Sequence, residues 1–183
     1  KMKDRKIKFR YFTIMEWEKE QDFLRQEGLK GWRFTKATLL GIYHFEKCEP
    51  EDVVYQLDYN PDGIAHKEQY VQMFQDCGWE YIQDYFGYSY FRKPASEMAG
   101  NEEIFCDDES RLEMVKRIFL SRMVPLIAIF FLLIIPNLYT QSTNHSLAGY
   151  ALNWGFWILF ILYLFLFLVL GRQFWKYWKK LSR

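Results

Sequence analysis

Charged side chains are missing from one long stretch of this chain of 183 residues. Residues 123–171 contain no Asp, Glu, Lys or Arg, and His145 is the one side chain among these 49 positions that titrates near neutral pH. A bilayer core about 30 Å thick needs about 20 mostly apolar residues in a helix, because lipid cannot hydrate the backbone. The gap therefore favours membrane-spanning helices over the alternative, a buried helical hairpin in a soluble core.

Two apolar runs inside this gap are long enough to span a bilayer. We predict a juxtamembrane helix and first transmembrane helix over residues 111–139, an external turn over 140–149 and a second transmembrane helix over 150–171. The turn contains Asn144-His145-Ser146, an acceptor pattern for N-glycosylation. Because such tripeptides also occur by chance, we interpret this one as part of a polar turn.

Basic residues flank both predicted spans and are absent from the turn between them. Lys and Arg near span ends stay on the cytoplasmic side, so we expect a two-span cell-membrane protein with both termini in the cytoplasm. Residues 172–183 form a basic aromatic tail, which we interpret as an interfacial anchor. The alternative is a tail that binds a specific partner. The expected membrane-interface residues are Arg122, Arg172, Trp175, Lys176, Trp178, Lys179 and Lys180.

The sequence also lacks the motifs that usually identify an enzyme. It contains no phosphate-binding glycine loop, no Cys and His pairing with zinc spacing and no nucleophile elbow. Three cysteines, Cys48, Cys77 and Cys106, show no paired spacing, which suits a reducing compartment. We therefore expect no enzymatic activity, no metal and no cofactor. His44 and His66 are the candidate bases for the remaining enzyme hypothesis, action on a membrane-derived substrate.

The charge balance argues against nucleic acid as a partner. Residues 1–93 carry 15 basic and 16 acidic side chains, so this region as a whole attracts no polyanion. Its first ten residues are strongly basic and are better suited to anionic lipid. The expected partners are membrane lipid and a protein in the membrane or at its cytoplasmic face, and a homo-oligomer stays open.

The N-terminal region contains two similar units. "GWRFTKATLLGIYHFEK" begins at Gly31, and "GWEYIQDYFGYSYFRK" begins at Gly78. Each follows an alternating strand pattern and a helical pattern, and the first helix has a capping-box sequence from Thr13 to Glu16. We predict an α+β domain over residues 1–95, built from a duplicated strand-helix-strand-strand unit (about 5–47 and 53–93). It should form a largely antiparallel sheet with two helices on one face.

An acidic linker over residues 96–110 joins this domain to the two-helix transmembrane hairpin. In the first predicted strand, Ile7, Phe9 and Tyr11 alternate with basic residues, the pattern of a half-solvated strand. Trp32 and Trp79 are expected to pack where each helix leads into its strand, with ligand stacking as the alternative. Strand tyrosines can pack or can line a pocket, and the candidate ligand-binding residues are Tyr43, Tyr55, Tyr59, Tyr88 and Tyr90.

The repeated Gly-Trp unit and the spacing from Trp17 through Gly31-Trp32 to "YFRK" resemble a bacterial family of unknown function, domain of unknown function 2812. The resemblance covers most of residues 5–95. It implies C-terminal membrane spans and genes often found beside PadR-type transcriptional regulators, and it supplies no catalytic residue. The resulting hypothesis is a membrane-anchored cytoplasmic sensing or adaptor protein that acts through a protein partner, in a regulatory or envelope-stress setting. The alternative is a sensor that binds an amphiphile or peptide on its tyrosine-rich sheet face.

Overall fold

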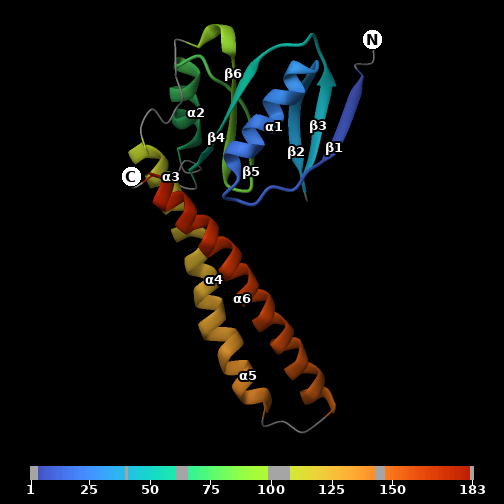
Figure 1. Cartoon of the computed structure of the whole chain (residues 1–183), viewed down its shortest axis with the longest axis vertical. Coiled ribbons are helices and arrows are strands. Elements are labelled where there is room, and N and C mark those ends of the chain that lie inside the picture. The colour runs from blue at the N-terminus through green and yellow to red at the C-terminus, as the bar shows by residue number, and fades with distance from the viewer. Residues whose placement is uncertain (1–3, 40, 61–65, 99–107, 143–146, 182–183) are drawn as a thin grey trace. The chain divides into compact units, whose positions relative to one another are not determined.

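The computed structural model describes residues 4–39, 41–60, 66–98, 108–142 and 147–181 (Figure 1). The tripeptide Asn144-His145-Ser146, interpreted above as part of a polar turn, lies outside these residues, as does most of the acidic linker. The chain divides into two compact units, Lys1–Met114 and Val115–Arg183. The described strands all lie in the first unit, and the described residues of the second unit are helical.

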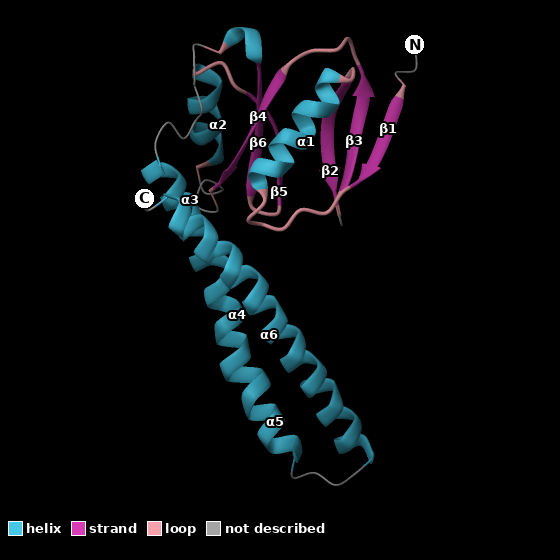
Figure 2. Cartoon of the chain, viewed as in Figure 1, coloured by secondary structure: helices cyan, strands magenta, loops and turns pink. Residues whose placement is uncertain are grey.

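The first unit contains the order strand, helix, strand, strand twice, as the sequence predicts (Figure 2). The first set is β1 (Arg5–Phe9), α1 (Trp17–Leu29), β2 (Trp32–Thr38) and β3 (Ile42–Lys47). The second set is β4 (Val53–Tyr59), α2 (Lys67–Asp76), β5 (Glu80–Tyr85) and β6 (Tyr88–Pro94), followed by the short helix η2 (Ala95–Glu97). The helix α3 (Asp108–Ile118) begins in this unit.

All pairs among the described strands are antiparallel, and the predicted mixed α+β class is confirmed. The strands form two sheets, with the orders β1-β3-β2 and β4-β6-β5. Side chains link the edges β2 and β5: the Gln83 side-chain oxygen accepts a hydrogen bond from the Ala37 amide at 3.2 Å, and the Tyr85 hydroxyl donates to the Thr38 carbonyl at 2.8 Å. The two sheets therefore meet at these strands through side chains.

The division into two sheets has a local cause. The pairing of β2 with β3 shifts register between Phe34 and Lys36, and the pairing of β5 with β6 shifts between Tyr81 and Gln83. Such bulges bend a strand and leave an extra residue unpaired. Because both facing edges carry one, a regular backbone ladder between β2 and β5 is interrupted.

The two helices lie on opposite faces of the sheet β4-β6-β5. Tyr90 and Phe91 are consecutive in β6 and so point to opposite faces. The Tyr90 hydroxyl donates a hydrogen bond to Glu20 of α1, whereas the Phe91 ring stacks on Phe74 of α2 at 4.2 Å between centroids. This sheet is thus covered on both faces.

The repeated glycines follow directly after the C-cap residues of the two helices. Gly31 and Gly78 have φ values of 79° and 80°, which residues with a Cβ rarely adopt. The start of α1 differs from the predicted capping box: the helix begins at Trp17, and Glu16 accepts a hydrogen bond from the Thr13 amide at 3.0 Å in the turn before it. The Glu16 side chain therefore closes the preceding turn, and no side-chain hydrogen bond caps the helix itself.

Two long apolar helical runs make up most of the second unit, and the first of them begins in the first unit. The first, Arg111–Thr140, passes through α3, η3 (Phe119–Met123), α4 (Val124–Ile129), η4 (Phe130–Ile134) and α5 (Ile135–Ser142). The second lies within α6 (Leu147–Leu181). The π-helical segments η3 and η4 each end two residues before a proline, Pro125 or Pro136, whose missing N–H disturbs the regular hydrogen-bond pattern.

Candidate functional site

The predicted ligand-binding tyrosines all lie in the core of the first unit. They come from three strands: Tyr43 from β3, Tyr55 and Tyr59 from β4, and Tyr88 and Tyr90 from β6. Each of these side chains is at most 4% exposed. The structure buries these five tyrosines in one core, where two of them, Tyr43 and Tyr90, contact α1.

Glu20 of α1 is the polar centre of this cluster. Its Oε1 accepts hydrogen bonds from the hydroxyl of Tyr43 at 2.6 Å and from the hydroxyl of Tyr90 at 2.5 Å. Tyr43 belongs to the sheet β1-β3-β2 and Tyr90 to the sheet β4-β6-β5. One carboxyl group thus fixes α1 to both sheets.

The buried environment changes the acidity of all three groups. Burial raises the pKa of the Glu20 carboxyl, and the two phenol hydrogen bonds only partly oppose this effect. Burial and the nearby Glu20 raise the pKa of Tyr43 and of Tyr90 above the ordinary phenol value. Both phenols therefore remain neutral hydrogen-bond donors at physiological pH.

Further contacts hold α1 over β4 and β6. Arg25 forms a two-point contact with Asp52, with its Nε 2.6 Å from Oδ1, just before β4. The Tyr88 hydroxyl donates a hydrogen bond to the carbonyl of Ile14 at 2.5 Å. A Cβ at Gly28 would lie 3.2 Å from the Glu51 carbonyl oxygen, so the helix and the segment just before β4 approach closely. A ligand that binds at the tyrosines would have to displace this helix.

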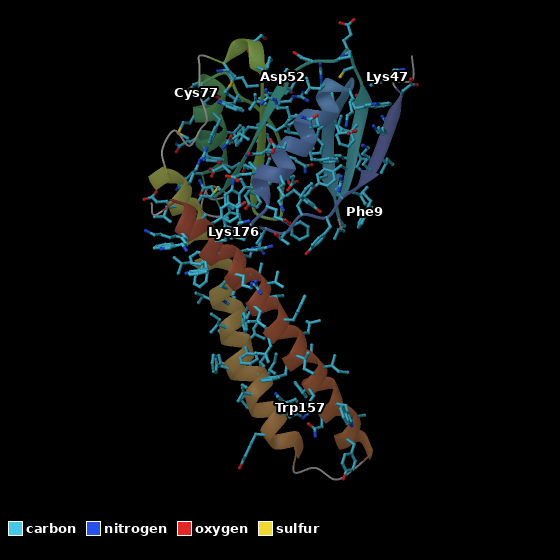
Figure 3. All side chains as sticks on the ribbon, in the orientation of Figure 1. Phe9, Lys47, Asp52, Cys77, Trp157 and Lys176 are labelled. Atoms are coloured by element: carbon cyan, nitrogen blue, oxygen red, sulfur yellow. The ribbon has the colours of Figure 1, made fainter. Side chains whose placement is uncertain are left out.

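The sheet β1-β3-β2 has one face that α1 covers and one that is open, which we call the open face. Ile7 and Phe9 of β1 pair with His44 and Ile42 of β3, so these four side chains share that face. Ile7 is 64% exposed and Phe9 is 69% exposed (Figure 3). Large apolar side chains on a sheet surface are typical of a binding surface.

The alternation predicted for β1 is present, and two of its basic side chains, Lys6 and Lys8, face α1. The Nζ atoms of Lys6 and Lys8 lie 2.9 Å and 2.8 Å from the carboxylate of Glu27, whose side chain is 1% exposed. Burial alone would raise the pKa of Glu27, but the hydrogen bonds from Lys8 and Lys6 outweigh it and lower that pKa. The buried carboxylate explains why the lysines turn inward and the apolar side chains remain outside.

The two candidate histidines lie apart from Glu20 and its tyrosines. His44 is half-buried on the open face, where its Nε2 is 3.2 Å from the Thr38 hydroxyl. His66 is exposed and immediately precedes α2. Among the described residues, no three His, Cys, Asp or Glu side chains are grouped closely enough to hold a metal ion.

The predicted interface residues lie in both apolar helical runs or beside them. Arg122 lies in η3, within the first run, and the other six lie in the C-terminal part of α6. The Nζ of Lys179 is 5.4 Å from the centre of the Trp175 ring, and the Nζ of Lys116 is 5.9 Å from that of Trp178. The side chain of Lys180 lies outside the described ones.

Ring contacts join the two apolar helical runs within the second unit. The Phe130 ring of η4 lies 5.4 Å from Phe160 and 5.6 Å from Phe167 of α6, measured between centroids. In its most apolar part, the first run is only 22% buried and the second run is 0% buried. A core helix of a soluble protein is mostly buried. Both runs are long and apolar enough to cross a membrane.

The chain thus falls into the class of mixed α+β domains that are followed by a hairpin of two helices of membrane-spanning length. It belongs to the family described as Protein of unknown function (DUF2812), which matches residues 16–129. The match extends from the start of α1 into α4, and it leaves out β1 and α6. No curated protein and no solved structure matches the chain.

Proposed function

We propose that this protein is a membrane-anchored cytoplasmic adaptor or sensing protein that binds a protein partner at the inner membrane face. In this proposal the two apolar helices cross the membrane with both termini in the cytoplasm, and the partner binds the open face. The observation that carries the proposal is the pair of exposed apolar side chains, Ile7 and Phe9, on a sheet face of the first unit.

The partner surface that fits best is an amphipathic helix. Each sheet has one face toward its own helix and one far face: Phe45 contacts Phe23 of α1, and Phe91 contacts Phe74 of α2. The far face of β4-β6-β5 is covered by α1, a helix from the other strand-helix-strand-strand unit. The far face of β1-β3-β2 is the open face, so a helix supplied by a partner would complete the same arrangement.

The test is site-specific photo-crosslinking in native membranes. A photoreactive residue in place of Phe9 should give an adduct whose partner peptide maps to an amphipathic helix. The matched control is the same residue in place of Gln72, which is exposed on α2. Ile7→Glu should abolish the Phe9 adduct because a carboxylate would enter the apolar contact. Adducts that are equal at both positions, or that survive Ile7→Glu, would contradict the proposal.

The cytoplasmic placement has a separate test. Cys77 is an exposed free thiol at the end of α2 (Figure 3). In intact cells it should resist a membrane-impermeant maleimide, and it should react after the membrane is permeabilised. Reaction in intact cells would place the first unit outside the cytoplasm.

The alternative function is a sensor that binds an amphiphile or peptide at the five tyrosines. Because α1 occupies that face, such binding would expose Trp17, which is 5% exposed. A saturable change in tryptophan fluorescence that Trp17→Phe removes would support the sensor. The adaptor is favoured because its open face is accessible without any rearrangement.

A further inference from the structure

One end of the first unit gathers apolar side chains on adjacent turns, and we call it the turn end. It is defined by Tyr11 after β1, Leu39 after β2 and Phe86 after β5. The Tyr85 hydroxyl donates to the Thr38 carbonyl at 2.8 Å and accepts from the Gly41 amide at 3.1 Å, which holds the two turns side by side.

The chain that follows β1 joins the same end. The Arg10 amide donates a hydrogen bond to the Gly41 carbonyl at 2.9 Å. A Cβ built on Gly41 would lie 3.6 Å from the Cα of Tyr11, so the two backbones are in contact. Three segments that are distant in the sequence thus meet at the turn end.

The three defining side chains are accessible to a large partner. Tyr11 is 74% exposed, Leu39 is 75% exposed and Phe86 is 57% exposed. They come from three separate segments, after β1, after β2 and after β5. Such separate apolar side chains suit insertion into a lipid interface, where each is surrounded by acyl chains and headgroups. Phe and Leu are residue types found on the apolar side of interfacial segments.

Phe86 occupies a backbone position that opposes a bulky side chain. Its φ is 50°, and it is the one described non-glycine residue with a positive φ. With Gly87, whose φ is 85°, it forms a two-residue hairpin turn in which Asn-Gly is the preferred sequence. An exposed phenylalanine at this position costs backbone free energy that Asn would not. The turn backbone therefore does not favour the aromatic ring, which packs edge-on against Tyr85 at 4.6 Å between centroids.

The charge around the turn end fits an anionic surface. The segments 9–15, 35–45 and 85–91, which build this end, contain no Asp or Glu. They carry two basic residues, Arg10 and Lys36, both of them exposed. Basic side chains beside exposed apolar ones are typical of domains that dock on anionic lipid.

We propose that the turn end is a lipid-docking site, at which Leu39, Phe86 and Tyr11 enter the interface of an anionic bilayer while Arg10 and Lys36 face the headgroups. The site adjoins the open face, since Phe9 and Ile42 lie in the segments that build it and Lys36 pairs with His44, but its docking side chains Leu39, Phe86 and Tyr11 are not among the four that define that face. It orients the first unit on the membrane surface.

The experiment uses the full chain in nanodiscs that contain anionic phosphatidylglycerol, with one chain per disc so that no second copy is present. The native cysteines are replaced by serine, and a nitroxide is attached at Leu39→Cys. Its collision rates with oxygen, which partitions into lipid, and with a polar nickel chelate are compared. The control nitroxide is at Lys47→Cys, at the opposite end of β3. The label at position 39 should collide with oxygen more often than the control label does. It should also be several-fold less accessible to the nickel chelate than the control.

Phe86→Asn is the decisive variant because Asn suits the turn and should keep or improve its stability. We expect it to raise the nickel accessibility of the label at position 39 several-fold, whereas Met73→Asn on α2 should not change it. Arg10→Gln should lower the ratio of docked to free states about fivefold, as expected for one basic residue near anionic lipid. The proposal is overturned if both labels give equal values, or if Phe86→Asn leaves the label at position 39 unchanged. Either result leaves the crosslinking test of the open face unaffected.

Discussion

Removal of the Glu20 carboxyl should destabilise the first unit by leaving two buried phenols without an acceptor. Tyr43 and Tyr90 are 2% and 1% exposed, so water cannot replace the lost partner. A buried donor left unsatisfied costs about 1–3 kcal/mol. Glu20→Leu should therefore lower the free energy of unfolding by about 2–6 kcal/mol, which is a large part of the roughly 5–15 kcal/mol of a typical domain.

The same reasoning predicts a rescue. When both partners of a buried hydrogen bond are replaced by apolar groups, the net cost is nearly zero. The triple variant with Glu20→Leu, Tyr43→Phe and Tyr90→Phe should therefore recover most of the stability that Glu20→Leu loses. Asp22→Leu, which removes an exposed carboxylate from the same helix, is the control and should change stability by less than about 0.5 kcal/mol.

Pulse proteolysis of the full chain in detergent micelles, over a urea series, measures these differences. The apolar helices stay in the micelle, and cleavage sites in the first unit report its unfolded fraction. A cost below about 1 kcal/mol for Glu20→Leu would refute the reasoning. So would a triple variant that is no more stable than the single one, because the loss would then come from packing and not from unsatisfied phenols.

The remaining predictions use the same assay. Burial raises the pKa of Glu20, so this residue should stabilise the fold fully below the ordinary Glu pKa. Its contribution should be lost as pH rises through its folded pKa, and Glu20→Gln should reduce this decrease in the free energy of unfolding. Burial would raise the pKa of Glu27, but the lysines lower it, so this residue should stabilise the fold above the ordinary Glu pKa. Its contribution should be lost as pH falls through its folded pKa, and Glu27→Gln should reduce the decrease in the free energy of unfolding at acid pH. Gly78→Ala should cost about 1–2 kcal/mol for its positive φ. Gly31→Ala should cost more, because its Cβ would lie 2.9 Å from the Cys48 carbonyl oxygen, and equal costs would contradict this explanation.

The order of elements could be predicted because local signals specify it. Alternation marks β4, whose bounds Val53–Tyr59 match the alternating run, and glycines with positive φ mark the ends of α1 and α2. The separation of β2 from β5 could not be predicted, since it depends on bulges at facing edges. A bulge is set by three-dimensional pairing and leaves no periodic signal in one strand.

The candidate site was only partly predictable for a related reason. Alternation groups Tyr55 with Tyr59 in β4 and Tyr88 with Tyr90 in β6, but it does not state how the two strands pair or what covers their faces. Glu20 was missed, because a glutamate near the start of an amphipathic helix usually faces solvent. Its seven-residue spacing from Glu27, with Phe23 between them, was the available signal. That spacing puts both carboxyls on the helix side that carries Phe23, toward the sheet.

The strand β3 connects the two surfaces that matter most for function. Its successive side chains alternate, so Ile42 and His44 lie on the open face while Tyr43 and Phe45 contact α1 from the other side. A partner helix on the open face would therefore press on the same strand whose Tyr43 hydroxyl binds Glu20. Because Glu20 also holds Tyr90 of the second sheet, a shift of β3 would reach β6 through one carboxyl group. In an adaptor this route would connect partner binding to the helix that covers the tyrosines, and Glu20→Gln would weaken that connection while leaving the open face intact.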